Sequence, residues 1–323
     1  MDISIKIKGM KDKIKIVVIL GQTATGKSDF AVEIAKNIKG EVISADSRQV
    51  YEGMDLGTGK ITKKEMQKVP HHLLDVASPS ATFSVSKYKK MSDKKITEIS
   101  KNGNIPIICG GTGFYIDAVI DDVVLPAVKP DKKLRKELEK KSKEELFLIL
   151  KKLDENRAET IDRNNPVRLI RAIEIAKALG SVPALKKSDD SKYDVIKIGL
   201  ALPDDILKER IYKRLHARIK SGMIKEVQDL YNRGISWRKL ENFGLEYRYC
   251  AQFIQGKFGD TNPTTLKLRG AREEMIEKLN TEIWHYAKRQ KTWFKRDANT
   301  LWIDPREIHE KALALKKIKD FLK

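Results

Sequence analysis

Apolar and polar positions follow two alternating patterns along the chain. Four short runs rich in β-branched and aliphatic residues have the length and composition of buried strands: Ile14 to Leu20, Glu41 to Ala45, Ile105 to Cys109 and Val195 to Leu202. After the first run, Asp29 to Ile38 carries its apolar residues at helical spacing. Strands that alternate with helices indicate a mainly parallel sheet with helices on both faces. The pattern therefore predicts an α/β protein with a doubly wound core.

The region between the third and fourth predicted strands has a different pattern. Residues 121–191 carry charged helical sequence without a strand pattern, and it begins after Pro126 and Pro130. We predict that this region is an inserted helical subdomain. The core is then expected to consist of residues 1–120 together with residues 192–323.

Helical patterns dominate again from Asp204 onward, with a polar, turn-rich break at Phe258 to Thr264. A last basic helix and a short strand at Leu301 to Ile303 are predicted to follow. No window approaches the roughly 18 consecutive apolar residues of a membrane span. Met1 to Met10 alternates apolar residues with lysine, unlike the apolar block of a secretory signal. We expect a cytoplasmic protein that makes no membrane contact.

Charge adds the first indication of a partner. The chain has 65 Lys and Arg residues against 45 Asp and Glu residues, which leaves a formal net charge of +20. Such an excess favours a partner with many phosphates, although a lysine-rich composition spread over solvated helix faces gives the same number. Cys109 and Cys250 are far apart and have no CxxC spacing, which argues against a disulfide framework and against a cysteine metal site.

A phosphate-binding motif lies between the first predicted strand and helix. The sequence GQTATGKS fits GxxxxGK[ST] and consists of Gly21, Gln22, Thr23, Ala24, Thr25, Gly26, Lys27 and Ser28. Its backbone N–H groups and the helix N-terminus suit phosphate oxygens, Lys27 adds a positive charge, and Ser28 can bind Mg²⁺. We therefore expect this P-loop to bind a diphosphate or a triphosphate. A second GxGK, Gly57 to Lys60, lacks the spacing and the preceding strand.

Asp46 follows the second predicted strand, so it is expected at the same carboxyl edge of the sheet as the P-loop. A carboxylate there could hold Mg²⁺ together with Ser28 or a water molecule, or it could be a residue of a surface turn. Because kinases, GTPases, ATPases and some transferases share the P-loop, this motif alone does not define the reaction.

Several further motifs occur in a specific order after the P-loop. Taken together they resemble the tRNA dimethylallyltransferase family, and the resemblance covers about residues 14–303. The motifs are GQTATGKS, Ser44 to Lys60 (SADSRQVYEGMDLGTGK), Pro70 to Asp75 (PHHLLD), Gly110 to Ile116 (GGTGFYI), Asn164 to Glu174 (NNPVRLIRAIE) and Ala287 to Phe294 (AKRQKTWF).

The resemblance implies a prenyl transfer from dimethylallyl diphosphate to N6 of the adenosine on the 3′ side of the tRNA anticodon. It implies that the P-loop, with Lys27 and a Mg²⁺ ion at Ser28, binds the donor's diphosphate. It further implies that Asp46 accepts a hydrogen bond or a proton from N6 and that Thr112 contacts the same nucleotide. Arg210 and Arg214, spaced i, i+4 in a predicted helix, could close over the diphosphate or face solvent.

The resemblance also implies residues that contact tRNA. The target base must leave the anticodon loop to enter a closed pocket. The implied contacts are Asp46, Ser47, Arg48, Gln49, Thr112, Asn164, Asn165, Pro166, Val167, Arg168, Gly244 and Arg248. The helical insertion is expected to face the tRNA anticodon stem-loop, and the enzyme is expected to act as a monomer.

One segment departs from the family pattern. Where the family has a Gly-Tyr-Arg-Gln-like sequence, this chain has Phe243 to Arg248 (FGLEYR). Glu246 facing phosphate would be unfavourable. Two explanations are open: a shifted register in which Arg248 makes the contact, or a role for Glu246 in reading a base edge.

Two other features allow a functional and a structural interpretation. His71 and His72 are adjacent but have no third ligand, so no metal site is assigned to them. In the basic helix near the C-terminus the aromatic residues are expected to be mainly core, and base stacking by Trp293 is the less favoured alternative. The helix combines Lys288, Arg289, Lys291, Lys295 and Arg296 with Trp284, Tyr286, Trp293 and Phe294.

Three other functions remain to be compared. An adenylate isopentenyltransferase would prenylate a free nucleotide, but the charge of +20 and the basic C-terminal helix argue against it. A P-loop nucleotide or small-molecule kinase would transfer a phosphoryl group, and the DSRQVY segment disfavours it. A tRNA-binding protein with an inactive P-loop is disfavoured because Lys27, Ser28 and Asp46 are all present.

Overall fold

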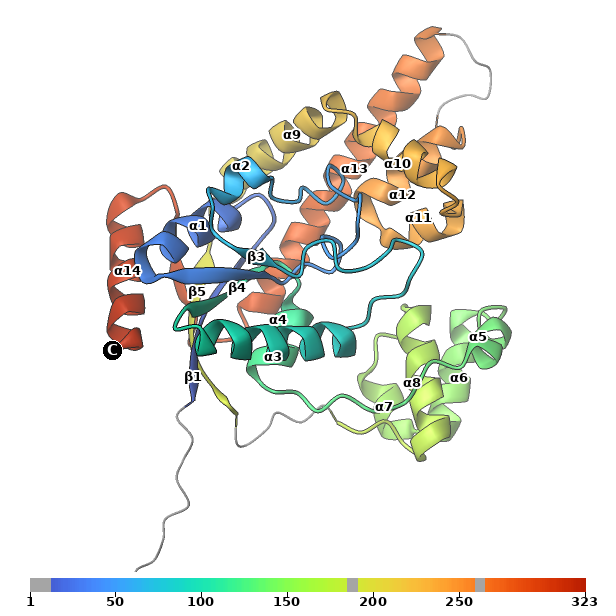
Figure 1. Cartoon of the computed structure of the whole chain (residues 1–323). Coiled ribbons are helices and arrows are strands. Elements are labelled where there is room, and N and C mark those ends of the chain that lie inside the picture. Colours follow the sequence, from blue (N-terminus) through green and yellow to red (C-terminus); the bar gives the residue numbers. More distant parts are fainter. Residues whose placement is uncertain (1–12, 185–190, 259–264) are drawn as a thin grey trace, which may run out of the picture. The chain divides into compact units, whose positions relative to one another are not determined.

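The computed structural model of the chain describes residues 13–184, 191–258 and 265–323 (Figure 1). Two segments considered in the sequence analysis, Met1 to Met10 and the turn-rich break after Phe258, lie outside the described residues. So do residues 185–190 of the expected insertion.

The chain divides into two compact units. The first unit comprises residues 1–122 and 190–323, and the second comprises residues 123–189. In the part of the chain that the structure describes, no helix has the length and apolar character needed to cross a bilayer.

The strands of the first unit form one six-stranded sheet in the order β3-β2-β4-β1-β5-β6, and all neighbours within the described residues pair in parallel. This confirms the predicted α/β class with a mainly parallel sheet. The sequence pattern missed β3, because two residues at a sheet edge have no period to detect. The strands are β1 (Ile14–Gly21), β2 (Gly40–Ser44), β3 (His71–His72), β4 (Ile105–Gly110), β5 (Tyr193–Leu200) and β6 (Leu301–Ile303).

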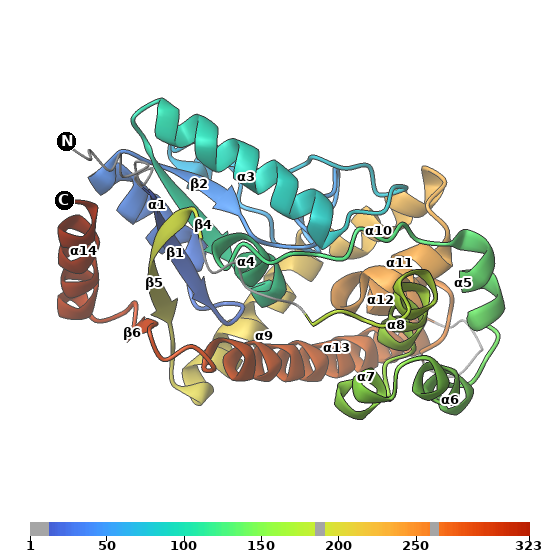
Figure 2. The ribbon, with the colours of Figure 1, turned by 90° about the horizontal axis from the view of Figure 1, so that it is seen from below.

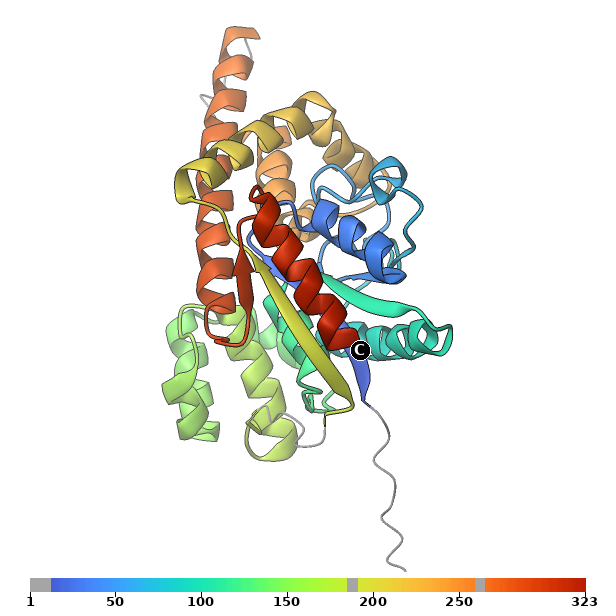
Figure 3. The same ribbon diagram turned by 90° about the vertical axis from the view of Figure 1, so that its left-hand side faces the viewer.

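Helices cover both faces of this sheet (Figures 2 and 3). Successive side chains of β1 point to opposite faces. Val17 and Ile19 belong to one buried cluster with residues of α1 and α14, whereas Ile16 and Val18 belong to another with residues of α3, α4 and α13. These helices are α1 (Lys27–Ile38), α14 (Ile308–Leu322), α3 (Val85–Lys101), α4 (Gly113–Ile120) and α13 (Thr265–Phe294).

The C-terminus differs from the sequence prediction. The strand at Leu301 to Ile303 was expected to follow the last helix, but α14 comes after it and packs near β5 (Figure 3). Ala314 and Ile318 of α14 are fully buried. Lysines occupy much of this helix and only a narrow stripe of it is apolar, so its helical pattern is difficult to detect in the sequence.

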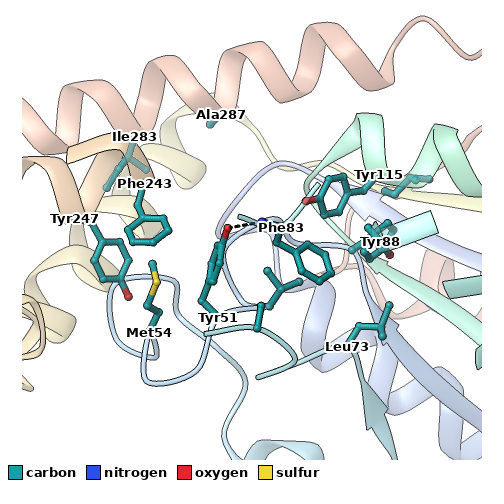
Figure 4. Packing of buried hydrophobic residues seen from close by; sticks show 14 of the residues in the cluster. Tyr51, Met54, Leu73, Phe83, Tyr88, Tyr115, Phe243, Tyr247, Ile283 and Ala287 are labelled. Atoms are coloured by element: carbon teal, nitrogen blue, oxygen red, sulfur yellow. Dashed lines mark hydrogen bonds between the residues drawn. The ribbon is translucent and has the colours of Figure 1, made fainter. Parts of the chain in front are cut away.

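A layer of shorter helices adjoins α13. Tyr51 and Met54 extend from the loop after β2 into an apolar cluster with Phe243, Tyr247 and Ile283 (Figure 4). The ring centroids of Tyr51 and Phe243 are 5.0 Å apart, which fixes this loop against the helices. The helices of this layer are α9 (Asp204–Lys220), α10 (Met223–Asn232), α11 (Trp237–Phe243) and α12 (Leu245–Ile254), and α2 (Lys63–Met66) follows the loop.

The second unit is helical and has its own core. Leu146, Leu150, Leu169 and Ile173 are fully buried within it. Glu174, whose side chain is only 1% exposed, is paired with an arginine at 2.7 Å. Its helices are α5 (Lys132–Leu138), α6 (Lys143–Leu153), α7 (Glu155–Thr160) and α8 (Pro166–Leu179).

Candidate active site

The P-loop connects β1 to α1 through a backbone that few residues could adopt. A Cβ atom at Gly21 would lie 2.5 Å from the carbonyl oxygen of Leu200 on β5, so a side chain does not fit there. Ala24 and Gly26 have φ angles of 62° and 92°. Left-handed residues of this kind turn successive N–H groups to one side, which is typical of an anion-binding concavity. The loop is therefore shaped for phosphate by its backbone.

A cleft of about 740 Å³ opens beside this loop. It brings together the P-loop, the loop after β2, residues 55–65, helix α9 and helix α13. Of the P-loop residues, Gly21, Gln22 and Thr25 lie buried beneath the cleft, where the Thr25 hydroxyl donates to the Gln22 carbonyl oxygen at 2.8 Å. The other predicted residues in the cleft lining are Thr23, Ala24, Gly26, Lys27, Ser28, Asp46, Gln49, Arg210 and Arg214.

Lys27 is the cation of the P-loop, and its side chain is partly buried. Its Nζ donates to the carbonyl oxygen of Gln22 at 2.5 Å. The pKa of Lys27 is lowered to about 8, mainly by burial and also by the nearby positive charge of Arg214. A bound anion would give this ammonium group an oppositely charged partner and would favour its charged form.

Asp46 lies in the same cleft as the P-loop. Strands β2 and β1 lie on either side of β4 in the parallel sheet, so the loops after them emerge at the same edge. Its Oδ1 accepts hydrogen bonds from the backbone N–H of Arg48 at 2.8 Å and of Gln49 at 3.3 Å. The backbone N–H of Ser47 donates to the hydroxyl of Thr112, which lies between β4 and α4, at 3.1 Å. The carboxylate and the threonine are thus held by the two adjoining strand ends.

The side chains that follow Asp46 make intramolecular contacts. Arg48 Nε donates to the carbonyl oxygen of Phe243 at 2.7 Å. Gln49 Oε1 accepts from the hydroxyl of Ser44 at 3.3 Å, and its Nε2 donates to the carbonyl oxygen of Gly59 at 3.4 Å. Arg48 therefore ties the loop to α11, and Gln49 ties it to the second glycine-rich segment.

Three arginines of α9 line the cleft. Arg210 lies near the P-loop, with Nη1 3.9 Å from a Cβ built on Gly26. Arg214 and Arg218 converge on Gly59: a Cβ there would lie 2.2 Å and 1.5 Å from their Nη2 atoms. Burial lowers the pKa of Arg214 to about 10 and also lowers the pKa of Arg218. Arg210 and Arg214 are among the predicted diphosphate residues, whereas Arg218, which continues their spacing of four residues, is not.

The second glycine-rich segment, Asp55 to Lys60, is not a P-loop, but it forms one wall of the cleft. The carboxylate of Glu226 on α10 accepts hydrogen bonds from three consecutive backbone N–H groups, those of residues 55, 56 and 57, at 2.9, 2.7 and 3.0 Å. It also accepts one from the Tyr247 hydroxyl at 2.7 Å. Glu226 therefore sets the position of this wall.

Helix α13 holds the P-loop from the other side. Gln290 is buried; its Oε1 accepts from the backbone N–H of Thr23, and its Nε2 donates to the carbonyl oxygen of Gly111, both at 2.8 Å. Trp293 Nε1 donates to Asp117 at 2.9 Å, and its ring lies 3.9 Å from the guanidinium of Arg296. The AKRQKTWF motif thus supplies contacts within the protein. No pattern in the sequence indicates the role of Gln290.

The residues predicted on α8 lie in the second unit. The side chain of Asn165 caps the helix by accepting from the backbone N–H of Arg168 at 3.2 Å, and Pro166 occupies the first turn. Val167 is 75% exposed. Asn164 accepts from Lys143, and Arg168 pairs with an aspartate at 3.6 Å. Asn165 and Pro166 thus have a local structural function.

The divergent segment begins at Gly244, which separates α11 from α12 with φ 79°. Glu246 does not face open surface: it is 15% exposed, and its Oε1 lies 3.2 Å from Nη1 of Arg218. Burial raises the pKa of Glu246, while Arg218 opposes that rise. Arg248 is exposed, and its Nε donates to the carbonyl oxygen of Glu241 at 3.1 Å.

A P-loop after the first strand of a parallel sheet, with a carboxylate from the next strand in the same cleft, defines a P-loop enzyme. The family model described as IPP transferase matches residues 49–297, which is most of the chain. The chain belongs to this family, the tRNA dimethylallyltransferases, as the resemblance predicted.

Relatives and solved structures agree. The chain is 41% identical over 290 residues to tRNA dimethylallyltransferase 2 of Treponema denticola, covering 89% of this chain and 93% of the relative. The tRNA isopentenylpyrophosphate transferase of Bacillus halodurans has a similar structure, with a TM-score of 0.68 and 37% identity over 96% of this chain and 98% of that one. A eukaryotic dimethylallyltransferase acting on tRNA gives a TM-score of 0.75 with 25% identity, over 96% and 79% of the two chains.

Proposed function

We propose that this chain transfers a dimethylallyl group from dimethylallyl diphosphate to N6 of the adenosine on the 3′ side of the tRNA anticodon, releasing diphosphate. One observation carries the proposal: the P-loop and the carboxylate of Asp46 line a single cleft in a member of the tRNA dimethylallyltransferase family. A phosphate site and a proton-accepting carboxylate within one cleft suit a reaction in which a weak nucleophile, such as the N6 amine of adenine, displaces a diphosphate.

In this proposal the donor's diphosphate occupies the P-loop. Lys27, Arg210 and Arg214 stabilise the negative charge that develops on the leaving oxygen. Their side chains suit this role because all three line the cleft and none forms an ion pair within the described residues. We infer that the Thr23 to Ser28 backbone contributes the remaining phosphate contacts.

A Mg²⁺ ion fits the same site. The described residues contain no cluster of three or more His, Cys, Asp or Glu side chains that would hold a metal alone. Mg²⁺ commonly needs only one or two protein ligands because phosphate oxygens and water complete its octahedron. The Ser28 hydroxyl, which lines the cleft, is the ligand we propose. Such an ion would neutralise charge on the diphosphate.

The reaction is then one displacement. The N6 lone pair forms a bond to C1 of the dimethylallyl group as the C1–O bond breaks, and the bonding electrons leave with diphosphate. Asp46 accepts the proton that N6 loses, and Thr112 helps to orient the base. Both residues are held by backbone hydrogen bonds of the strand-end loops, so little reorganisation is needed.

The acceptor base must leave the anticodon loop to reach Asp46. We propose that Ser47, Arg48, Gln49 and Thr112 contact the region around this base, and that Gly244 and Arg248 contact tRNA nearby. Asn164, Asn165, Pro166, Val167 and Arg168 of the helical second unit are proposed as a separate tRNA contact. The net charge of +20 supports phosphate binding along a large substrate. We propose that the enzyme acts as a cytoplasmic monomer.

The experiment incubates the purified protein with Mg²⁺, labelled dimethylallyl diphosphate and either bulk tRNA or AMP, followed by nucleoside mass analysis. Prenylated adenosine in tRNA is the expected result. Label on AMP alone would indicate a nucleotide prenyltransferase, and no transfer to either would refute prenyl transfer. A parallel reaction with EDTA should lose turnover if Mg²⁺ is required.

A further inference from the structure

The third arginine of α9 differs from the other two. Arg210, Arg214 and Arg218 are spaced by four residues and line one cleft, so they share one face of the helix. Only Arg218 forms an ion pair within the described chain, through Nη1 to Glu246 at 3.2 Å. Its Nη2 is buried and has no hydrogen-bond partner among the described residues.

Glu246 fixes one edge of this guanidinium. The two side chains are 13% and 15% exposed, so the pair is shielded from solvent. The next residue, Tyr247, donates to Glu226, the carboxylate that also holds residues 55 to 57. The ion pair is thus built into the same framework as the cleft wall at Gly59. Arg218 cannot easily rotate away without breaking a shielded contact.

The unpaired Nη2 of Arg218 packs against Gly59 in the wall of the cleft. A Cβ on Gly59 would lie 1.5 Å from Nη2, and both residues line the cleft that contains the P-loop. A buried N–H group without an acceptor is unfavourable, and guanidinium groups suit phosphate oxygens because they donate several hydrogen bonds in one plane. Arg214 is near both this point and Lys27, since it approaches the same Gly59 site and lowers the pKa of Lys27.

We propose that Arg218 is a further residue that binds the donor's diphosphate and that Glu246 positions it. The proposal rests on the proposed function, because it identifies the anion as the diphosphate of that reaction. It also explains the divergent FGLEYR segment: its glutamate orients an arginine toward the cleft instead of facing phosphate. A purely structural role would require only that the pair join α9 to α12, with no effect on anion binding.

The test measures binding of inorganic pyrophosphate with Mg²⁺ by calorimetry, and binding of tRNA separately. In the main variant, Arg218→Met with Glu246→Gln, both charges are removed together, so no unpaired charge stays buried. We expect pyrophosphate to bind about tenfold more weakly or worse, as for loss of a charge-assisted hydrogen bond. Binding of tRNA should stay within about twofold, since it draws on many phosphates.

Two single variants separate the positioning role of Glu246 from the binding role of Arg218. Glu246→Gln keeps Arg218 but weakens its anchor, so we expect a loss of pyrophosphate affinity of about threefold, smaller than in the double variant. Arg218→Lys keeps the charge but removes the planar donor edge, and a loss of several fold is expected even if the double variant does not fold. Lys220→Met is the matched control, because it removes an exposed cation from α9 outside this cleft.

Unchanged pyrophosphate affinity in the folded double variant, or in Arg218→Lys if only that one folds, overturns the proposal. So does a loss confined to tRNA binding, which would place the acceptor's phosphate at Arg218 instead. The prenyl transfer assay of the wild type distinguishes failure of the Arg218 proposal from failure of the proposed function. Transfer by the wild type with unaltered pyrophosphate binding in the variants refutes only the role of Arg218, whereas absent transfer refutes the proposed function.

Discussion

Gln290, on α13, accepts a hydrogen bond of 2.8 Å from the backbone N–H of Thr23 in the P-loop. The same amide donates to the carbonyl oxygen of Gly111 at 2.8 Å, so it joins the two glycine-rich turns at the ends of β1 and β4. The two residues in the first bond are 267 positions apart in the sequence. A helix near the C-terminus therefore determines how the phosphate-binding loop is held.

Replacing Gln290 with leucine should destabilise the protein and weaken pyrophosphate binding. The change leaves the partly buried N–H of Thr23 and the buried carbonyl oxygen of Gly111 without partners, which costs about 1–3 kcal/mol of the free energy of unfolding. Denaturant titration and calorimetry with pyrophosphate measure the two effects. Thr292→Ala, an exposed site on the same helix, is the control and should match the wild type in both. Equal stability of Gln290→Leu and the wild type would contradict this role.

Asp46→Asn separates the charge of the carboxylate from its structural hydrogen bonds. The amide oxygen of asparagine can still accept from the backbone N–H groups of Arg48 and Gln49, so the loop should keep its conformation. Loss of the proton acceptor should lower turnover by about 10²–10⁴-fold. Asp46→Ala should also abolish turnover, with tRNA binding within a few fold of the wild type.

The control for Asp46 is Glu52→Gln, which neutralises an exposed carboxylate in the same loop. Its prenyl transfer rate should equal that of the wild type. If Asp46→Asn keeps full turnover, Asp46 is not the proton acceptor. If it loses tRNA binding instead, its role lies in recognition.

Much of the fold follows from local pattern. The strands that line the site have apolar runs long enough to detect, and Gly21 to Ser28 specifies both the turn and its chemistry. Asp46 could be located near the P-loop because a residue that follows a parallel strand must emerge at the shared sheet edge. These inferences need only neighbours in the sequence and the topology of a parallel sheet.

The supporting contacts could not be inferred in the same way. Gln290 reaches Thr23 across most of the chain, and Glu226 reaches three backbone N–H groups that have no side-chain signature. The role of Glu246 could not be inferred from the sequence, because its partner Arg218 lies 28 residues away on another helix. Such pairs depend on how α9, α12 and α13 pack, and helical periodicity defines each buried face but not what lies against it.

Glu226→Ala should destabilise the cleft wall. Three backbone N–H groups and the Tyr247 hydroxyl would lose one shared acceptor, and we expect a loss of at least about 2–3 kcal/mol in the free energy of unfolding. Donor KM should rise because Gly59 lies on this wall. Glu209→Ala breaks an exposed pair with Lys213 and should cost less than about 1 kcal/mol. Similar stabilities of the two variants would contradict the anchoring role of Glu226.

The pKa of Lys27 predicts a pH dependence of donor binding. With a pKa of about 8 in the free protein, Lys27 is mostly protonated at pH 7 and mostly neutral at pH 9. If the diphosphate binds the ammonium form, its affinity should fall by about tenfold between these pH values. The turnover number of the saturated enzyme should change less, because a bound anion favours the charged form and raises the pKa. Initial rates over a range of donor concentrations at each pH measure both quantities.

Loss of folding cannot produce this trend through Lys27. The folded-state pKa is below the unfolded value of 10.5, so the unfolded chain binds more protons between pH 8 and 10.5. The contribution of this group to the free energy of unfolding therefore rises with pH in that window, opposite to donor affinity. Lys27→Met should bind the donor weakly at both pH values and lose the tenfold dependence. A dependence that persists in Lys27→Met would assign the titration to another group, and a flat profile in the wild type would show that donor binding does not depend on the Lys27 proton.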